Sequence, residues 1–182
     1  MDNPDLWSRI SKQDDLNAFK SLHAMYYAQL CDFVFSYLKT KELCEEVISD
    51  VFFNIWHKRT ELKDIRNIKS YLYTCSRNHS IDQIRKNSIR IQPDICCTEI
   101  EISDPDSELT KQIESTEFKK NIQLAMEQLP PQCRLIFKML INDQLSYKEI
   151  SQILELSRKT VEAQVLIAYK KLTVTLKNVY VK

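Results

Sequence analysis

The 182-residue chain contains no glycine at all. Glycine is the residue that most readily adopts positive φ in hairpin turns, in bulges and in loops that cradle phosphates. Its absence disfavours a hairpin-rich β protein and excludes a glycine-rich nucleotide-binding loop. Helices joined by short polar turns are therefore the expected fold.

Apolar residues recur every three or four positions over most of the chain, which predicts amphipathic helices. Asn3-Pro4 is a helix-opening pair, and Asp14 is the expected N-cap of the next helix. The later helices are expected over residues 15–39, 40–56, 67–86, 118–129, 131–141, 146–154 and from 158 to at least 172. We expect an all-α protein with two small helical domains, residues 1–90 and 115–182, each built from four helices.

Charge is distributed unevenly although the formal net charge is only +1. Residues 77–92 carry a net charge of +3, residues 93–117 carry −7, and residues 158–182 carry +5. This pattern predicts two cationic surfaces joined by an anionic tether. The proline-containing segment 91–114 is expected to be an acidic flexible linker, although charge alone fits a solvated loop without a role equally well.

The six cysteines and three histidines show no spacing typical of a metal site or a catalytic site. We interpret the cysteines as reduced, mostly buried side chains of a cytoplasmic protein, with the adjacent pair Cys96-Cys97 as a candidate redox-sensitive exception. The N-terminus is acidic and no run of about 18 apolar residues exists, so neither a secretory signal nor a membrane span is expected. No cofactor and no enzymatic activity are predicted. A nuclease built from scattered carboxylates is the enzyme alternative.

The most informative local pattern is a helix-turn-helix signal near the C-terminus. Ser146-Tyr147-Lys148-Glu149 forms a capping box, Glu155-Leu156 makes a turn, and Ser157 caps a second, basic helix. Glu155 stands where such turns usually have glycine, because that backbone favours positive φ, so either Glu155 stores modest strain or the turn takes another path. The pattern favours DNA binding over an ordinary solvated helical hairpin. The side chains expected to face DNA from the second helix are Arg158, Lys159, Thr160, Glu162, Ala163 and Gln164.

Two segments together resemble the extracytoplasmic-function sigma factors of bacterial RNA polymerase. One motif is Ser70-Tyr71-Leu72-Tyr73-Thr74-Cys75-Ser76-Arg77-Asn78, followed by Asp82 and Arg85-Lys86. The other is Leu129-Pro130-Pro131, then Arg134, then Leu145-Ser146-Tyr147-Lys148-Glu149-Ile150 and Ser157-Arg158-Lys159-Thr160-Val161. The resemblance implies a polymerase-binding, promoter-melting domain (region two) followed by a domain that reads the upstream promoter element (region four).

The resemblance also implies roles for individual residues. Those expected to capture the melted downstream element are Leu62, Tyr73, Cys75, Arg77, Asn78, Arg85 and Lys86. Those expected to bind polymerase are Glu46, Val47, Asp50 and Phe53. Tyr147 and Lys148 are expected to touch phosphates near the N-terminus of the short helix that precedes the reading helix. The implied partners are core RNA polymerase, promoter DNA and an anti-sigma factor. A helix-turn-helix regulator that binds operator DNA without joining polymerase is the alternative.

Overall fold

The computed structural model describes residues 4–90, 122 and 124–180, and within these ranges the regular structure is helical, with no strand. The labelled helices are α1 (Pro4–Gln13), α2 (Leu16–Leu38), α3 (Lys41–His57), α4 (Ile68–Arg90), α6 (Pro131–Ile141), α7 (Tyr147–Leu154) and α8 (Arg158–Tyr180). The prediction of an all-α fold is confirmed. The expected linker and the Cys96-Cys97 pair lie outside the described residues.

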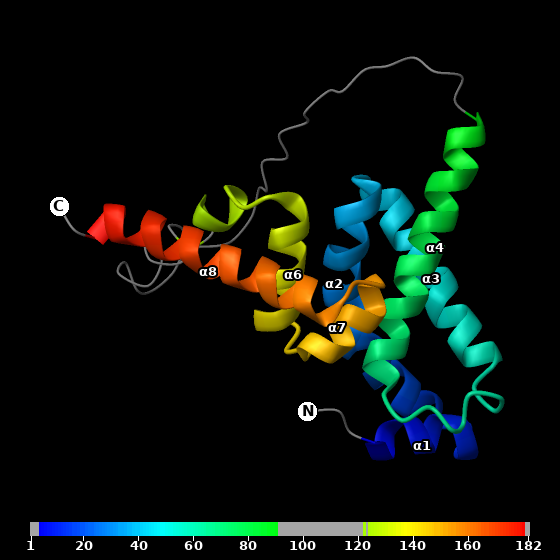
Figure 1. Ribbon diagram of the computed structural model, residues 1–182. Coiled ribbons are helices and arrows are strands. Elements are labelled where there is room, and N and C mark those ends of the chain that lie inside the picture. Colours follow the sequence, from blue (N-terminus) through cyan, green and yellow to red (C-terminus); the bar gives the residue numbers. More distant parts are fainter. Residues whose placement is uncertain (1–3, 91–121, 123, 181–182) are drawn as a thin grey trace, which may run out of the picture.

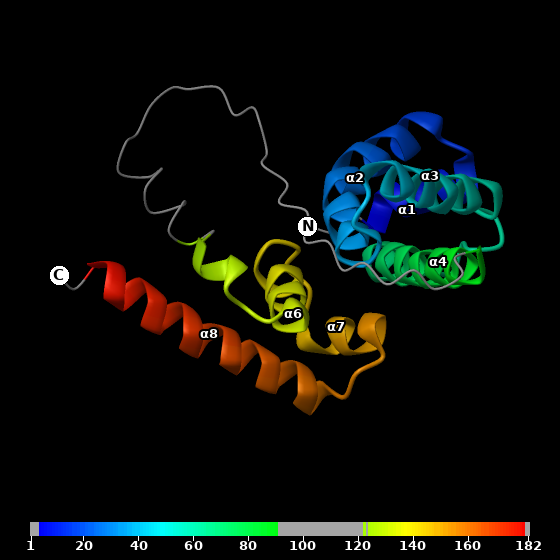
Figure 2. The ribbon, with the colours of Figure 1, turned by 90° about the horizontal axis from the view of Figure 1, so that it is seen from above.

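Helices α1 to α4 form one helical unit, which Figure 2 shows beside the unit of α6 to α8. In the first unit, α2 packs against α1, α3 and α4. Leu22, Leu30, Ile48, Ile55 and Leu72 are almost completely buried in its core. Burying an aliphatic side chain of this size stabilises a fold by about 1.5–3 kcal/mol. The amphipathic spacing of the sequence therefore accounts for the packing of this unit.

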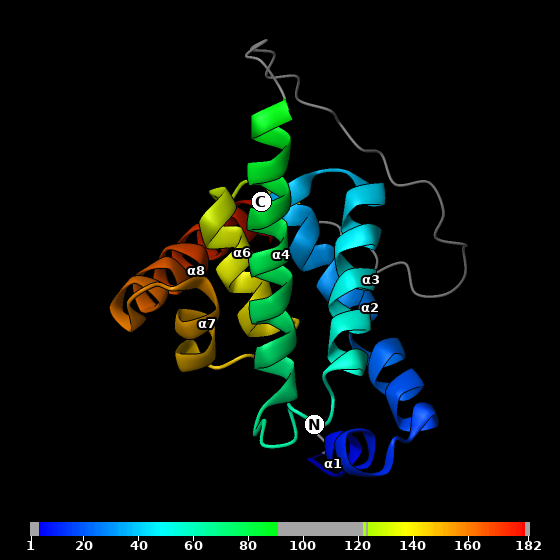
Figure 3. The same cartoon turned by 90° about the vertical axis from the view of Figure 1, so that its right-hand side faces the viewer.

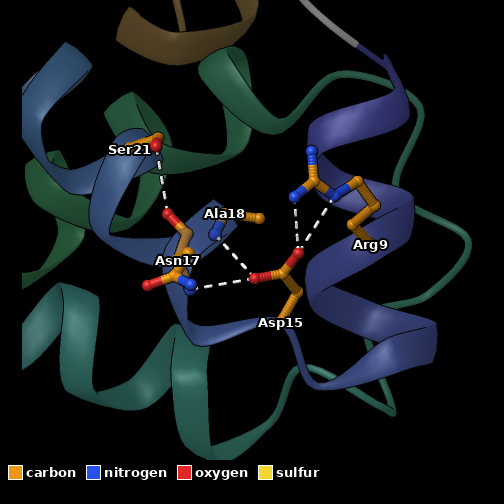
Figure 4. Close-up of polar contacts among 5 residues, drawn as sticks. All are labelled: Arg9, Asp15, Asn17, Ala18 and Ser21. Atoms are coloured by element: carbon orange, nitrogen blue, oxygen red, sulfur yellow. Dashed lines mark hydrogen bonds and ion pairs between the residues drawn. The ribbon is translucent and has the colours of Figure 1, made fainter.

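The turn from α1 into α2 uses a different cap from the expected one. Asp15, rather than Asp14, adopts the extended backbone of an N-cap, and its Oδ1 accepts hydrogen bonds from the amides of Asn17 (2.9 Å) and Ala18 (3.0 Å) (Figure 4). The Ala18 amide and the Arg9 guanidinium together hold the pKa of Asp15 below its usual value. Asp14 has positive φ (55°), which is incompatible with the extended backbone of an N-cap.

The connection between α3 and α4 is held against the first helices by specific contacts. The Trp7 indole N–H donates to the Leu62 carbonyl (3.1 Å). The Arg59 guanidinium lies 4.3 Å from the centre of the Trp56 ring and pairs with Asp14 at 2.6 Å. These contacts fix the loop that carries Leu62, so α1 acts as a brace for the residues that precede α4.

The second unit begins with a helical segment at 124–127 and continues through α6, α7 and α8. Pro130 precedes α6, and Pro131 occupies its first turn, where the missing amide costs no helical hydrogen bond. The predicted capping box at Ser146 and Glu149 is present at the start of α7. A small buried cluster joins the 124–127 segment to α6 and α8 through Ala125, Leu129, Cys133, Phe137, Ala168 and Leu172, among others.

The two units share one continuous apolar core. Buried residues of α6 and α7, such as Ile136, Met139 and Ile150, belong to the same cluster as Phe33 and Leu72 of the first unit. Helix α4 packs against both α3 and α7, and Figure 3 shows it between them. Figure 1 shows α7 between α4 and α8. In the described part of the chain, no helix combines the length and hydropathy of a membrane span.

Replacing Trp7 with phenylalanine tests the brace on the 58–67 loop. Trp7→Phe keeps an aromatic ring but removes the indole donor, leaving the partly buried Leu62 carbonyl without this partner. We expect the free energy of unfolding to fall by about 1–2 kcal/mol, measured by urea denaturation followed by circular dichroism. An unchanged unfolding midpoint would show that this hydrogen bond does not hold the loop.

Candidate nucleic-acid interface

The N-terminal turns of α8 expose most of the side chains predicted to read DNA. Ser157 Oγ accepts a hydrogen bond from the Thr160 amide (3.0 Å), so the predicted N-cap is present. The first backbone amides of a helix have no partner within the helix and point out of its N-terminal end. Arg158 and Lys159 are exposed, and Arg158 pairs with Glu162 at 2.9 Å. Among the other predicted residues, Ala163 and Lys148 are exposed, whereas Thr160, Gln164 and Tyr147 are partly buried.

The turn between α7 and α8 contains a non-glycine residue in the left-handed region. Glu155 has φ 56° and ψ 40°, a conformation that costs a residue with a Cβ about 1 kcal/mol or more. Its exposed carboxylate forms an ion pair with Arg77 of α4 at 2.9 Å. The sequence left two possibilities open for this turn, and the structure shows the one in which Glu155 takes the strained, positive-φ backbone. The Glu155 side chain contacts the other helical unit.

The carboxylate of Glu149 joins the N-termini of two helices. One oxygen accepts from the backbone amide of Ser146 at the start of α7 (2.7 Å). The other accepts from the Asn67 side-chain amide (2.5 Å) and the Ser70 hydroxyl (3.2 Å). Asn67 itself caps α4 by accepting from the Ser70 amide (2.9 Å). The positive ends of two helix dipoles thus meet at one carboxylate.

These hydrogen bonds determine the ionisation of Glu149. Partial burial acts to raise its pKa, but hydrogen bonds from Ser146, Asn67 and Ser70 outweigh it, and the pKa lies below its usual value. Each of these donors stabilises the charged form of the carboxylate. Glu149 is therefore ionised near neutral pH, and its charge contributes to the contact between the two units.

Tyr73 lies at the junction between the two units and is fully buried, with 0% of its side chain exposed. Its ring makes an edge-to-face contact with Phe33 of α2, with ring centres 5.0 Å apart. Burial, and then the nearby Asp143 carboxylate from the α6–α7 connection, raise the pKa of Tyr73, although no hydrogen bond of normal geometry reaches its hydroxyl. In this arrangement Tyr73 offers no face on which a base can stack.

The other residues predicted to capture the downstream element lie along α4 and the preceding loop. Arg77 is held between Glu155 and Tyr37, whereas Asn78, Arg85 and Lys86 are exposed. Cys75 and Leu62 are half-buried. The structure thus leaves Asn78, Arg85 and Lys86 of α4 open to solvent and covers Tyr73 and most of Arg77.

The predicted polymerase-binding residues form a stripe on α3, with one exception. Glu46, Asp50 and Phe53 are exposed, Phe53 by 68%, and they follow each other at four- and three-residue steps. Val47 is only 4% exposed and belongs to the core. The Val47 side chain therefore packs in the core below the exposed stripe and is not available for contact with a partner.

Two hollows adjoin these surfaces. One, of about 410 Å³, lies between the acidic side of α3 and the basic side of α4 and is lined by Glu46, Asp50, Arg85 and Lys86, among others. The larger, of about 760 Å³, is a groove between the two units, lined by residues of α2, α4, α6 and α7. Its walls combine apolar groups such as Phe35 and Leu135 with charged groups such as Asp32, Arg134 and Lys138.

The sequence analysis did not identify the residues that join the two units. Asn67 and Lys69 precede or begin α4, and their partners are Glu149 and the backbone carbonyl of Asp143. Glu149 was recognised as a cap, but no local pattern indicates its second set of donors. Among the described residues, no group of three or more histidine, cysteine or acidic side chains is positioned to bind a metal ion.

Comparisons with known proteins match both units. The family model described as sigma-70 region 2 matches residues 22–89, and the model for sigma-70 region 4 matches residues 119–172. The chain is similar to the sigma factor RpoE of Bartonella quintana, solved in complex with the anti-sigma factor NepR (TM-score 0.60, 20% identity, covering 89% of this chain and 98% of that chain). It is also similar to CnrH, solved with the cytosolic domain of CnrY (TM-score 0.58, 18% identity, covering 97% and 99%). No curated protein sequence gives a significant match.

Glutamine substitution at Glu149 tests the charge at the junction. Because its pKa is lowered in the folded protein, ionised Glu149 stabilises the fold above its ordinary pKa of 4.5, and that contribution is lost as the pH falls through the lowered pKa. We expect Glu149→Gln to reduce the free energy of unfolding at neutral pH by about 1 kcal/mol, allowing for solvent screening.

The difference between the wild type and Glu149→Gln should shrink as the pH is lowered from about 5 to about 3, measured by urea denaturation at each pH. Glu61→Gln, at an exposed glutamate of the α3–α4 connection, is the control and should leave the pH profile unchanged. A pH-independent difference at position 149 would contradict the role of its charge.

Proposed function

This chain belongs to the sigma-70 family, as a sigma factor of the extracytoplasmic-function kind, and from this membership we propose which of its surfaces carry out each step of initiation. As a sigma factor it directs core RNA polymerase to promoters and has a regulatory rather than a catalytic role. The presence of both family regions, in order, in one chain carries this conclusion. Because core polymerase works in the bacterial cytoplasm, we expect the protein to act there.

The start of α8 reads the upstream promoter element in this proposal. Arg158 and Lys159 are exposed cationic side chains that can bind phosphates and donate hydrogen bonds to the acceptor edge of guanine. Gln164, one to two helical turns further along, offers a hydrogen-bond donor and an acceptor to a base edge. The exposed Lys148, near the start of α7, adds a phosphate contact. The Arg158–Glu162 pair pre-orients the guanidinium and is exchanged for DNA contacts on binding.

Helix α4 and the loop before it capture the melted downstream element. Opening a duplex requires partners for the unstacked bases and the freed phosphates. Asn78 offers a hydrogen-bonding edge and Arg85 supplies charge, and both side chains are exposed. Tyr73 is buried and has to become exposed before its ring can serve as a stacking face. Leu62 and Cys75 form part of the wall of the pocket that receives an unstacked base. Arg77 and Lys86 bind the phosphates of the melted strand.

The stripe of α3 docks on polymerase. Glu46 and Asp50 supply negative charge beside the exposed ring of Phe53, a combination that complements a basic amphipathic helix. Interface energy concentrates at such exposed aromatic side chains, which supports Phe53 as the anchor of this surface.

The groove between the two units accommodates an anti-sigma factor. The two similar sigma factors were solved in complex with NepR and with the cytosolic domain of CnrY. A volume of about 760 Å³, with apolar walls and charges of both signs, suits an amphipathic helix laid across both units. A partner that binds there contacts α2 and α6 at once and holds them in the closed arrangement.

In vitro transcription with core polymerase tests these assignments on a genomic DNA library. Arg158→Ala and Gln164→Ala should lower promoter-specific transcripts by about 10- to 100-fold, because a lost base contact costs about 1–3 kcal/mol, while polymerase binding is retained. Glu46→Lys and Asp50→Lys should abolish polymerase binding in a pull-down.

Lys20→Ala, at an exposed site of α2 outside these surfaces, serves as the control and should behave like the wild type. If the two classes of variant behave alike, the assignment of surfaces is wrong. Tight operator binding by the free protein, without any gain in transcription on adding polymerase, would favour an ordinary helix-turn-helix regulator instead.

A further inference from the structure

Resting on the docking of α3 on polymerase proposed above, we propose that His57 positions the Phe53 ring for that docking. His57 was not among the polymerase-binding residues expected from the sequence, which are Glu46, Val47, Asp50 and Phe53. It acts through Phe53, because its imidazole packs on the phenyl ring and holds that ring in the orientation that a partner helix receives.

His57 continues the exposed stripe of α3 by one helical turn. Glu46, Asp50 and Phe53 follow each other at four- and three-residue steps, and His57 comes four residues after Phe53. Residues at these steps lie on the same face of a helix. His57 is exposed, as are the other three residues. The stripe therefore runs from two carboxylates, through an aromatic ring, to an imidazole at the C-terminal end of α3.

The Phe53 and His57 rings lie next to each other and are nearly parallel. Their centres are 6.1 Å apart and their planes differ by 9°. Offset parallel packing is a favoured arrangement of two aromatic rings at this separation. Because the Phe53 side chain is 68% exposed, the core restrains its ring only weakly, and the contact with His57 adds a restraint on the solvent side.

The turn of α3 that carries both rings is fixed to the rest of the first unit. The Lys58 amide donates to the Asn54 carbonyl (2.9 Å), which closes the last turn of the helix. The Asn54 side chain contacts the His79 ring of α4, with 3.3 Å between their nitrogen atoms. With the backbone of this turn fixed, the freedom that remains to Phe53 is in its side-chain torsions, which the ring of His57 restrains.

Restraining Phe53 in the free protein favours binding. A side chain that becomes ordered only in a complex loses conformational freedom when the complex forms, and this loss weakens the interaction. An aromatic anchor that is already held in place avoids most of that loss. Histidine suits this position, because its ring can stack while its polar edge stays in water at the exposed end of the helix.

A double-mutant cycle on polymerase binding tests whether His57 acts through Phe53. The dissociation constant of the full chain, labelled at its N-terminus, is measured by fluorescence anisotropy on titration with core polymerase. We expect Phe53→Ala to raise it about 30-fold or more and His57→Ala to raise it about two- to tenfold. His57→Tyr, which keeps a ring, should bind nearly as the wild type does. In the Phe53→Ala background, His57→Ala should have no further effect.

The matched control is His23→Ala. His23 of α2 packs on the buried ring of Phe52, with ring centres 4.5 Å apart, so this variant also removes a histidine from a phenylalanine of α3. It should bind polymerase like the wild type, with circular dichroism confirming that each variant is folded. Three results would overturn the proposal: equal losses for His23→Ala and His57→Ala, a His57→Tyr variant as weak as His57→Ala, or a His57→Ala loss that persists without Phe53.

Fluorine NMR of the free protein measures the ring contact independently of polymerase. With para-fluorophenylalanine in place of Phe53 alone, the fluorine resonance should be displaced from that of the free amino acid, and His57→Ala should move it back toward that value. An unchanged resonance would show that the rings do not stack in solution. A resonance that moves, together with normal polymerase binding by Phe53→Ala, would instead show that α3 does not dock through this stripe. In that case the proposed docking fails first, and the role of His57 fails with it.

Discussion

The structure depends on one carboxylate that serves two helices. Glu149 accepts the Ser146 amide at the start of α7 and the Asn67 and Ser70 donors at the start of α4. Helix N-termini favour negative charge, and a single partly buried carboxylate satisfies both. The apolar cluster shared by the two units supplies the driving force for their contact. The hydrogen bonds of Glu149 determine how α7 is positioned along α4.

The position of the second unit determines which surfaces are available. The acidic stripe of α3 and the start of α8, where we propose the contacts with polymerase and with upstream DNA, remain exposed in this arrangement. The Tyr73 and Arg77 portion of α4 is covered. The surfaces that we propose for polymerase binding and for DNA melting are thus separated in space. A partner in the groove between the units would strengthen the same closed state.

Local sequence patterns predicted most of the helices correctly. The capping box of α7 and the serine cap of α8 are present as expected, because such caps involve residues only three positions apart. The N-cap of α2 was placed one residue early, at Asp14 instead of Asp15. The adjacent aspartates are chemically identical candidates for the N-cap. The choice between them depends on two ion pairs, Arg9 with Asp15 and Arg59 with Asp14.

The sequence by itself determined the helical fold class, the two family regions and the side chains at the start of α8. The fold class and the start of α8 follow from the missing glycine, from three- and four-residue periodicity and from caps, all of which act over one or two helical turns. The two family regions were indicated by the resemblance of two sequence motifs to a known family. Only the tertiary structure decided that Val47 and Tyr73 are buried and that Glu149 and Glu155 contact α4. The contacts of these glutamates join residues 78 to 82 positions apart, across a segment whose sequence carries no information about how two separate apolar faces meet.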